Sequence, residues 1–386
     1  MEVNHKREIP LSKEVDITWP IEPHTKAKHE ILKYYLGAWF PILATVYSRF
    51  LYIDGFAGPG EYDGGEDGSP IIALRVALEH KLREKFQLPG KELVFIFIEK
   101  DEAKYQNLQR KLNEIQRPNN FKVVPYCNSF EEVFETIIAE FEEQSKRLAP
   151  SFVFIDPFGP TGFPMALVRW LAEQPSAETL ITFQYQSLNQ WFLKDPSKHK
   201  RLTELYGDER WLQALNISDS RRKEKYLRES YKKALEELGW KVRFFRMENK
   251  HHQTQYYLFY TTCNWRGSLE MKRAMWKAAP EGDFEYSDLT DSRQLKLFSS
   301  AKDEEYSNEL AEQLFKAHRE RTISKETLLK NEVAWHPTCL ERHLTRALEI
   351  LEYENSLPKI TKVQLPNNRR RRKRTYPKDC RITFSP

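Results

Sequence analysis

The stretch that decides the fold runs from Tyr52 to Gly65 and reads YIDGFAGPGEYDGG. An apolar run, Phe50–Ile53, leads into it and is typical of a buried strand, and this strand ends at Asp54. Glycines follow at once, and they permit a tight turn whose backbone lies open where side chains would block a ligand. In a doubly wound α/β fold, ligands bind beyond the carboxyl ends of the strands, over this first turn. The stretch therefore predicts a strand–loop–helix unit that opens a nucleotide pocket.

The spacing of the glycines distinguishes between the cofactors that such a pocket could bind. The G-x-G-x-x-G fingerprint of NAD-binding folds is not met, because residue 63 is Asp and the next glycine is Gly64. We interpret the loop as the D-x-F-x-G-x-G loop of a class I S-adenosylmethionine (SAM) methyltransferase, and an ordinary glycine-rich strand–helix turn is the alternative. The predicted cofactor-binding residues in this loop are Asp54, Phe56, Ala57, Gly58 and Gly60.

The composition fits one large domain with an appendage, or two domains. The chain has 386 residues, of which 40% are hydrophobic and 13% aromatic, and this is enough for a sizeable core. Its four cysteines lie far apart without a C-x-x-C pair, so we expect no metal site, no disulfide framework and a cytoplasmic location. No apolar run approaches the roughly 20 residues that cross a bilayer, so we expect no membrane association.

Two further strands are predicted to bring polar side chains to the same pocket. Leu93–Ile98 is apolar throughout, as in a parallel strand covered on both faces, and Glu99 follows it. An acidic residue at this position holds a ribose in such folds. Glu99 is our first choice and Asp101 the second, and a solvated acid at a helix start is the alternative, which suits Asp101 better. Asn128 follows a short strand where the adenine ring is usually contacted, and a role as N-cap of the next helix explains it equally well, as it does Ser129.

A fourth apolar strand, Phe152–Ile155, ends in the turn Asp156-Pro157-Phe158-Gly159. The turn is similar to the D-P-P-Y/F loops of enzymes that methylate an exocyclic amino group. In those loops the Asp and a proline carbonyl accept hydrogen bonds from the amino group, and the aromatic ring stacks on an extruded base. One proline is missing here, and the shortened form resembles that of tRNA guanine-N2 dimethyltransferases. The predicted catalytic residues are Asp156, Pro157 and Phe158, and a purely structural turn is the alternative.

The remaining segments predict the domain organisation of an α/β protein. Trp240–Met247 and Tyr256–Thr262 are expected to form the antiparallel edge of a seven-stranded, Rossmann-like class I methyltransferase sheet. The predicted divisions are an N-terminal arm at 1–24, the methyltransferase domain at 25–285 with a helical insertion at 188–239, a linker at 286–304, and a winged helix-turn-helix domain at 305–386.

A wider resemblance covers most of the chain, from about Lys26 to the C-terminal region. The segments YIDGFAGPGEYDGGEDGSP, FIEKD, FVFIDPFGPTGFP and Met271–Trp276 resemble the three-Cys-motif partner protein (TcmP) family. Membership implies a Rossmann-like methyltransferase fold and a partner that bears a three-cysteine motif, but no particular substrate. Methyltransferases often place an amphipathic helix, such as the one predicted from Lys26, beside the SAM pocket. Lys26, Lys28 and His29 are therefore candidates there, with packing as the alternative role for His29.

Six consecutive basic residues near the C-terminus predict a polyanionic partner. They are Arg369, Arg370, Arg371, Arg372, Lys373 and Arg374, in a chain of net charge +5. A solvated tail is the alternative to a wing that holds phosphates. Together these features favour a SAM-dependent N-methyltransferase that acts on a nucleic-acid base and works with a three-cysteine-motif partner. RNA is slightly favoured over DNA as its substrate. The second hypothesis is a nucleotide- or nucleic-acid-binding partner subunit without turnover, and the glycine spacing disfavours an NAD(P)-dependent enzyme.

Overall fold

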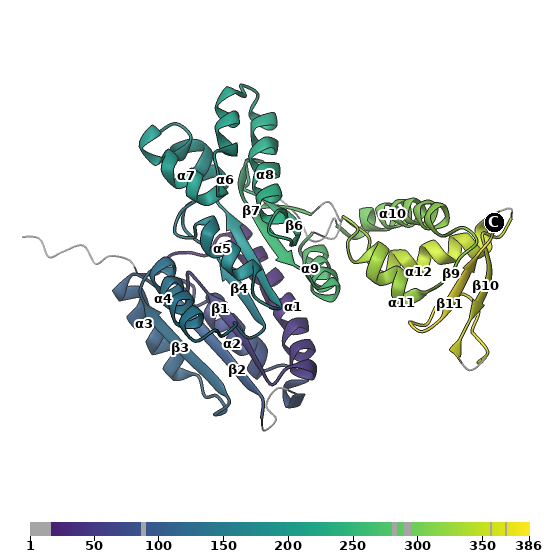
Figure 1. Cartoon of the computed structure of the whole chain (residues 1–386), viewed down its shortest axis with the longest axis horizontal. Helices are drawn as coiled ribbons and strands as arrows, with labels where there is room; N and C mark the ends of the chain where they lie inside the picture. The colour runs from purple at the N-terminus through teal and green to yellow at the C-terminus, as the bar shows by residue number, and fades with distance from the viewer. Residues whose placement is uncertain (1–16, 86–89, 280–283, 289–294, 356, 367–368) are drawn as a thin grey trace, which may run out of the picture.

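One mixed sheet, in the order β3-β2-β1-β4-β5-β7-β6-β8, carries most of the chain (Figure 1). The computed structural model describes residues 17–85, 90–279, 284–288, 295–355, 357–366 and 369–386. The strands of this sheet are β1 (Arg49–Asp54), β2 (Glu92–Glu99), β3 (Phe121–Cys127), β4 (Ser151–Ile155), β5 (Ala177–Phe183), β6 (Lys241–Glu248), β7 (Thr254–Thr262) and β8 (Glu285–Ser287). The helices around it are α1 (Pro23–Val46), α2 (Ser69–Leu78), α3 (Glu102–Glu114), α4 (Phe130–Glu143), α5 (Met165–Ala172), α6 (Tyr185–Ser187), α7 (His199–Tyr206), α8 (Ser220–Glu236) and α9 (Trp265–Ala278).

The strand directions are those of a class I methyltransferase sheet. Strands β1 to β5 pair in parallel, and β7 runs antiparallel to both β5 and β6. The predicted fold class and its antiparallel edge are therefore confirmed. The predicted number of strands is wrong, because β8 adds an eighth strand in parallel with β6, with Met247 opposite Tyr286. A strand of three residues is too short to leave a periodic pattern in the sequence.

Apolar side chains of the central strands alternate between two cores, one on each face of the sheet. In β1, Phe50 and Tyr52 pack in the core that α1, α2 and α9 cover. Leu51 and Ile53 pack in the other core, which α4 and α5 cover. Successive side chains of a strand point to opposite faces, so a wholly apolar strand must be covered on both sides. This arrangement leaves the carboxyl ends of the strands as the place for a site.

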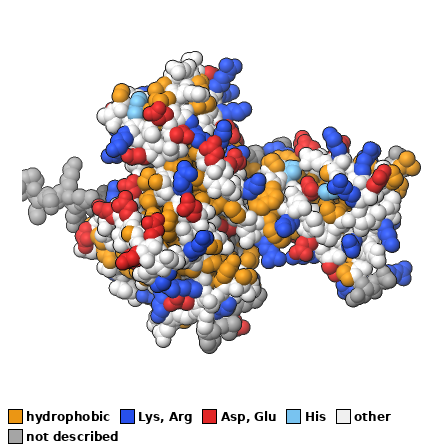
Figure 2. All heavy atoms as spheres, in the orientation of Figure 1, with side chains coloured by type: hydrophobic (Ala, Val, Ile, Leu, Met, Phe, Trp, Pro, Cys, Tyr) orange, Lys and Arg blue, Asp and Glu red, His pale blue; other side chains and the backbone are white. Residues whose placement is uncertain are grey.

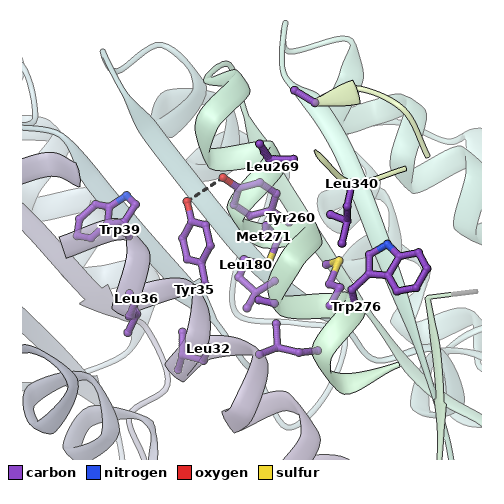
Figure 3. Packing of buried hydrophobic residues seen from close by; sticks show 14 of the residues in the cluster. Leu32, Tyr35, Leu36, Trp39, Leu180, Tyr260, Leu269, Met271, Trp276 and Leu340 are labelled. Carbon is purple, nitrogen blue, oxygen red and sulfur yellow. Dashed lines mark hydrogen bonds between the residues drawn. The ribbon is translucent and has the colours of Figure 1, made fainter. Parts of the chain in front are cut away.

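Helix α1 is held against the sheet by a buried polar cluster. Figure 3 shows Tyr35 and Trp39 on α1, and Tyr35 Oη lies 2.8 Å from Tyr260 Oη of β7. The hydroxyl of Tyr35 and the indole N–H of Trp39 both donate to the carboxylate of Glu178, the latter over 3.0 Å. Burial raises the pKa of Glu178. Because these buried polar groups satisfy one another, α1 has a fixed position on the sheet.

The C-terminal part forms a second, three-stranded antiparallel sheet, β10-β11-β9, packed with helices. It lies beside the main sheet, at the yellow end of the chain in Figure 1. Its elements are α10 (Leu295–His318), β9 (Thr322–Ser324), α11 (Lys325–Leu328), α12 (Glu341–Glu349), β10 (Ile360–Gln364) and β11 (Arg381–Phe384). A winged helix-turn-helix requires parts of this kind, and that assignment stays a prediction.

Two of the predicted boundaries differ from the structure or lie partly outside it. The linker predicted at 286–304 is too long, because β8 continues to Ser287 and α10 begins at Leu295. Polar, acidic composition indicated a linker there, but such composition is also compatible with an exposed helix. Residues 1–16 of the predicted arm lie outside the described residues, and α1 begins at Pro23. Across the described ranges, no helix is long and apolar enough to cross a membrane.

Helix α9 fixes the C-terminal part to the main sheet. The buried ammonium of Lys272 donates hydrogen bonds to the carbonyls of Val333 and His336. The indole N–H of Trp276 donates to the carbonyl of Thr338 over 2.7 Å, and Ser268 Oγ donates to the carbonyl of Ala334 over 2.8 Å. Apolar residues of both parts belong to one continuous core. The two parts therefore share an interior and are not joined by a loose tether.

Candidate active site

The loop after β1 is shaped by Asp54 and by the glycines that follow it. The Asp54 carboxylate is buried and accepts a hydrogen bond from Phe56 N over 3.2 Å. Burial raises the pKa of this carboxyl to about 7. Gly58 and Gly60 have φ angles of +63° and +84°, in the left-handed region that favours glycine. A Cβ at Gly60 would also lie 3.0 Å from Leu108 Cδ1, so the backbone conformation favours glycine there and a larger residue would crowd Leu108.

Glu99, at the end of β2, holds this loop in place. Its Oε2 accepts a hydrogen bond from Gly58 N over 2.8 Å, and its Oε1 accepts one from Asp101 N over 2.8 Å. The residue is only 6% exposed, yet it lines a cavity. Each carboxylate oxygen has further lone-pair capacity after accepting one hydrogen bond. The predicted ribose acceptor therefore lies at a cavity and can accept more hydrogen bonds.

The other two candidates near Glu99 lie at helix starts. Asp101 is the N-cap of α3, and its side chain accepts a hydrogen bond from the first helical turn. Ser129 caps α4 through a capping box with Glu132. The N-cap explanation of Asn128 is therefore wrong, because its neighbour takes that role. Both Asp101 and Asn128 line the cavity beside Glu99.

Two cavities meet at the loops that follow β1 and β4. One, of about 630 Å³, lies beside Glu99, and the other, of about 670 Å³, lies beside Asp156. They adjoin, because Phe56, Pro157 and Phe158 line both of them. We call them the Glu99 cavity and the Asp156 cavity. Of the predicted cofactor-binding residues in the glycine loop, those lining the Asp156 cavity are Phe56, Ala57, Gly58 and Gly60. Asp54 is buried and is not among the residues that line either cavity.

Asp156 forms an ion pair with Lys28 of α1. Lys28 Nζ lies 2.5 Å from Asp156 Oδ2, and the Lys28 side chain is only 7% exposed. The other oxygen, Asp156 Oδ1, is buried and has no hydrogen-bond partner among the described residues. An unsatisfied buried acceptor costs about 1–3 kcal/mol.

His29 follows Lys28 and lines the same cavity. Burial and the charge of Lys28 lower the pKa of His29 to about 3, so its imidazole is neutral at physiological pH. Its ring lies 5.7 Å from the ring of Tyr62. Lys26 is placed differently, since it pairs with Glu66 at the surface. Of the three candidates on α1, the structure brings Lys28 and His29 to the site and leaves Lys26 outside the cavity lining.

Pro157 and Phe158 have neighbours that the sequence did not reveal. Gln184 Nε2 donates a hydrogen bond to the Pro157 carbonyl over 2.8 Å. The Phe158 ring is 66% exposed, and the ring of Trp19 packs edge-on against it at 5.4 Å. Lys104 Nζ lies 4.9 Å from the centre of the Phe158 ring. Gln184 could have been anticipated, because it follows β5 and the carboxyl ends of parallel strands meet at one edge. No sequence pattern pointed to Trp19.

The basic run lies between β10 and β11, and its residues are not equivalent. The Arg371 side chain is 14% exposed, pairs with Glu352 and donates a hydrogen bond to Tyr353 Oη. This corrects the prediction that all six residues bind phosphates, because the guanidinium of Arg371 is engaged within the fold. Arg369 pairs with Asp379 over 3.1 Å. The remaining, exposed members are Arg370, Arg372, Lys373 and Arg374. On the face shown in Figure 2, Lys and Arg side chains lie among Asp and Glu side chains over most of the surface.

Comparisons with known proteins give a general likeness only. No family model and no curated protein matches the chain. It is similar to the O-methyltransferase from Bacillus cereus in complex with SAH, with 10% identity, coverage of 63% of this chain and 82% of that chain, and a TM-score of 0.33. It is also similar to protein LPL1258 from Legionella pneumophila, with 12% identity, coverage of 61% and 84%, and a TM-score of 0.33. The fold assignment rests on the strand order itself, and the TcmP resemblance stays a prediction.

Proposed function

We propose that the protein is a SAM-dependent methyltransferase that modifies an exocyclic amino group of a nucleic-acid base. The observation that carries the proposal is the position of the Asp156–Phe158 turn, because Asp156 lines one cavity and Pro157 and Phe158 line both. Asp156 lines a cavity that adjoins the one beside Glu99. An ionised carboxylate only accepts hydrogen bonds, and an amino group supplies hydrogen-bond donors.

The adjoining cavities suit a cofactor and an acceptor side by side. SAM would lie across the glycine loop, with its ribose hydroxyls at Glu99 and its adenine beside Asn128. Gly58 and Gly60 leave the backbone open there, since they project no side chain. When bound, SAM supplies a methyl group on a positively charged sulfonium. The protein's task is then to place the acceptor amino group in line with that methyl group.

An amino group on a base is a weak nucleophile, because its lone pair is delocalised into the ring. Hydrogen bonds accepted from the amino group localise the lone pair as the transition state forms. The Asp156 carboxylate and the Pro157 carbonyl would accept these hydrogen bonds, and Phe158 would stack on the extruded base. Gln184 already donates to the Pro157 carbonyl, which retains a second lone pair and is held in one orientation.

Two features support a nucleic acid as the substrate: the exposed Phe158 ring and the positive charge of the basic run. Phe158 is a largely exposed aromatic ring at the edge of both cavities, as stacking on a base requires. The exposed members of the basic run would hold phosphates, and the C-terminal part would act as a winged helix. We favour RNA over DNA as the substrate. We further propose that the protein acts in the cytoplasm and that a three-cysteine-motif protein is its partner.

Calorimetry and methyl transfer test the proposal in two steps. The full chain should bind SAM and S-adenosylhomocysteine but not NAD. It should then transfer a labelled methyl group from SAM to RNA or DNA, and mass spectrometry of the nucleosides identifies the modified base. Asp156→Asn is the matched control, because it keeps the size of the side chain and removes its charge. A chain that binds NAD in preference to SAM contradicts the proposal.

A second function, a nucleic-acid-binding partner subunit without turnover, is favoured by one observation. Gln184 occupies one hydrogen-bonding position on the Pro157 carbonyl, and Asp156 Oδ2 is taken by Lys28. The Pro157 carbonyl and the Asp156 carboxylate therefore each have one partner already, which leaves less acceptor capacity than the D-P-P-Y/F arrangement offers. SAM binding without methyl transfer to any nucleic acid, even with the three-cysteine-motif partner present, would support this second function.

A further inference from the structure

Two aromatic rings form a corner at the place where the two cavities adjoin. The ring centres of Trp19 and Phe158 lie 5.4 Å apart, and the planes of the two rings are inclined at 72°. Both residues line the Asp156 cavity, and Phe158 also lines the Glu99 cavity. The contact leaves most of Phe158 uncovered, since that residue is 66% exposed. A flat ring that stacks on one of the two meets the other at its edge, and aromatic rings favour both arrangements.

The segment that carries Trp19 is held against the glycine loop. The Trp19 carbonyl accepts a hydrogen bond from Asp63 N over 3.2 Å, and Thr18 Oγ1 donates to Asp63 Oδ1 over 2.5 Å. The indole ring also packs edge-on against the Tyr62 ring, with centres 5.8 Å apart. Pro20 follows directly and restricts the backbone of Trp19 to extended conformations. Trp19 therefore has a fixed place at the cavity.

A positive charge lies close to both rings of the corner. Lys104 Nζ is 5.0 Å from the centre of the Trp19 ring and 4.9 Å from the centre of the Phe158 ring. Lys104 lines the Glu99 cavity, and among the described residues it has no ion-pair partner. A phosphate would supply the missing counter-charge. An aromatic surface beside an unpaired ammonium group matches the two parts of a nucleotide, a flat base and a phosphate.

We infer that Trp19 binds the target nucleotide, with its ring against the base that stacks on Phe158, while Lys104 pairs with a phosphate next to that base. The inference rests on the proposed function and specifies its substrate as an unpaired nucleotide. A base inside a duplex is covered on both faces by its neighbours, so it reaches the corner only after extrusion. If Trp19 served only to pack the segment before α1, its ring would add nothing to the binding of a base.

Strands that differ by a single base test the inference. The probe is a short phosphodiester strand of abasic furan units, and matched strands carry one adenosine, cytidine or guanosine at the centre. Because all these strands have the same charge, calorimetry with S-adenosylhomocysteine present measures what the base contributes. At least one base should raise the affinity of the natural chain about ten- to hundredfold over the fully abasic strand, as stacking on aromatic side chains does.

Substitutions at Trp19 should reduce this gain and leave the affinity for the fully abasic strand unchanged. Trp19→Ala and Trp19→Leu should each lower the gain about tenfold, because both remove the ring. Trp19→Phe should keep most of the gain, since it keeps an aromatic ring in the corner. Trp191→Ala is the matched control, because Trp191 is 62% exposed and is not among the residues that line either cavity. If Trp19→Ala does not fold, Trp19→Leu decides, because it keeps an apolar side chain for packing.

Substitution of Lys104 should affect all strands alike. Lys104→Gln should flatten the salt dependence of affinity by about 0.7 in the log–log slope, for strands with and without a base. Lys26→Gln is its control and should leave the slope unchanged, because Lys26 pairs with Glu66 at the surface. An unchanged slope in Lys104→Gln would overturn the phosphate contact.

The inference is overturned if no base raises the affinity of the natural chain, or if Trp19→Ala and Trp19→Leu keep the full gain. It is also overturned if Trp191→Ala loses as much. A methyl-transfer assay on RNA and DNA separates these outcomes from failure of the proposed function. Loss of the gain in the Trp19 variants without methyl transfer by the natural chain supports the inference and contradicts the proposed function. Methyl transfer together with an undiminished gain in those variants does the reverse.

Discussion

The backbone N–H of Gly58 donates a hydrogen bond to Glu99 Oε2 over 2.8 Å, which joins the glycine loop to the end of the neighbouring strand. The other oxygen of Glu99 accepts from Asp101 N. A single carboxylate thus fixes the loops at the ends of β1 and β2. Glu99 shapes the Glu99 cavity before any cofactor enters it.

Glu99→Ala should lower both SAM affinity and stability. The substitution removes the proposed acceptor of the ribose hydroxyls, which is worth on the order of a hundredfold in affinity. It also leaves Gly58 N and Asp101 N unpaired, at about 1–3 kcal/mol for a buried group. Glu99→Gln keeps one acceptor oxygen and should lose less of each. Calorimetry with SAM and urea unfolding measure the two effects, and an alanine variant that binds SAM as tightly as the natural chain would reject the assignment.

Asp156→Asn should abolish methyl transfer while SAM affinity stays nearly unchanged. Asp156 lies in the cavity proposed for the acceptor, and its contacts matter mainly in the transition state, so turnover should fall more than binding. Both Asp156→Asn and Asp156→Ala leave the buried charge of Lys28 without its counter-charge, and Asp156→Ala should lose more stability, a few kcal/mol, because it also removes the hydrogen-bond acceptor. Adding Lys28→Met to Asp156→Ala should restore part of that stability. Undiminished turnover in Asp156→Asn would exclude the catalytic role.

Substitutions of the exposed and of the buried residues of the basic run should have different effects on the salt dependence of nucleic-acid binding. Changing Arg370, Arg372, Lys373 and Arg374 to Gln should flatten the dependence of nucleic-acid affinity on salt, by about 0.7 in the log–log slope for each lost contact to a single strand. Arg371→Gln is the control, because Arg371 is paired with Glu352. It should leave the slope unchanged and lower the free energy of unfolding. An unchanged slope in the fourfold variant would show that the basic run does not bind the phosphates of the nucleic acid.

Asp54→Asn should remove a pH dependence of stability. The pKa of Asp54 is raised from 3.8 to about 7 by burial in the folded chain, so the folded state holds this proton to a higher pH than the unfolded state. The contribution of Asp54 to stability is therefore greatest below 3.8 and declines as pH rises toward 7. The decline amounts to a few kcal/mol, at about 1.4 kcal/mol for each pKa unit. Urea unfolding at a series of pH values should show this fall in the free energy of unfolding for the natural chain and not for Asp54→Asn. If the free energies of both chains change with pH in parallel, the raised pKa of Asp54 is refuted.

The strands and their acidic ends were predictable because both signals are local in the sequence. An apolar run followed by Asp54, Glu99 or Asp156 needs no knowledge of distant residues, and parallel pairing then brings the three ends to one edge. The antiparallel pair β6 and β7 was likewise visible as two apolar runs. Three-residue β8 and the exposed start of α10 leave no such pattern, so the sheet size and the linker were misjudged.

The contacts that define the chemistry of the site were not predictable in this way. Lys28 and Asp156 are 128 residues apart, and only the packing of α1 on the sheet brings them together. Arg371 reads as one of six equivalent charges, but Glu352 draws it into the fold. In both cases a charged side chain is fixed by a partner distant in the sequence. Composition shows that the charges exist and not which of them are free.

The attachment of the C-terminal part through Lys272 and Trp276 has a geometric consequence. Buried hydrogen bonds and a shared interior hold this part against the main sheet, so the movement of its basic loop relative to the Asp156 cavity is restricted. A strand gripped by its phosphates at that loop would reach the cavity only with the nucleotide that lies at the matching offset along its length. The target would then be selected by its distance along the strand from the bound phosphates as well as by the identity of its base.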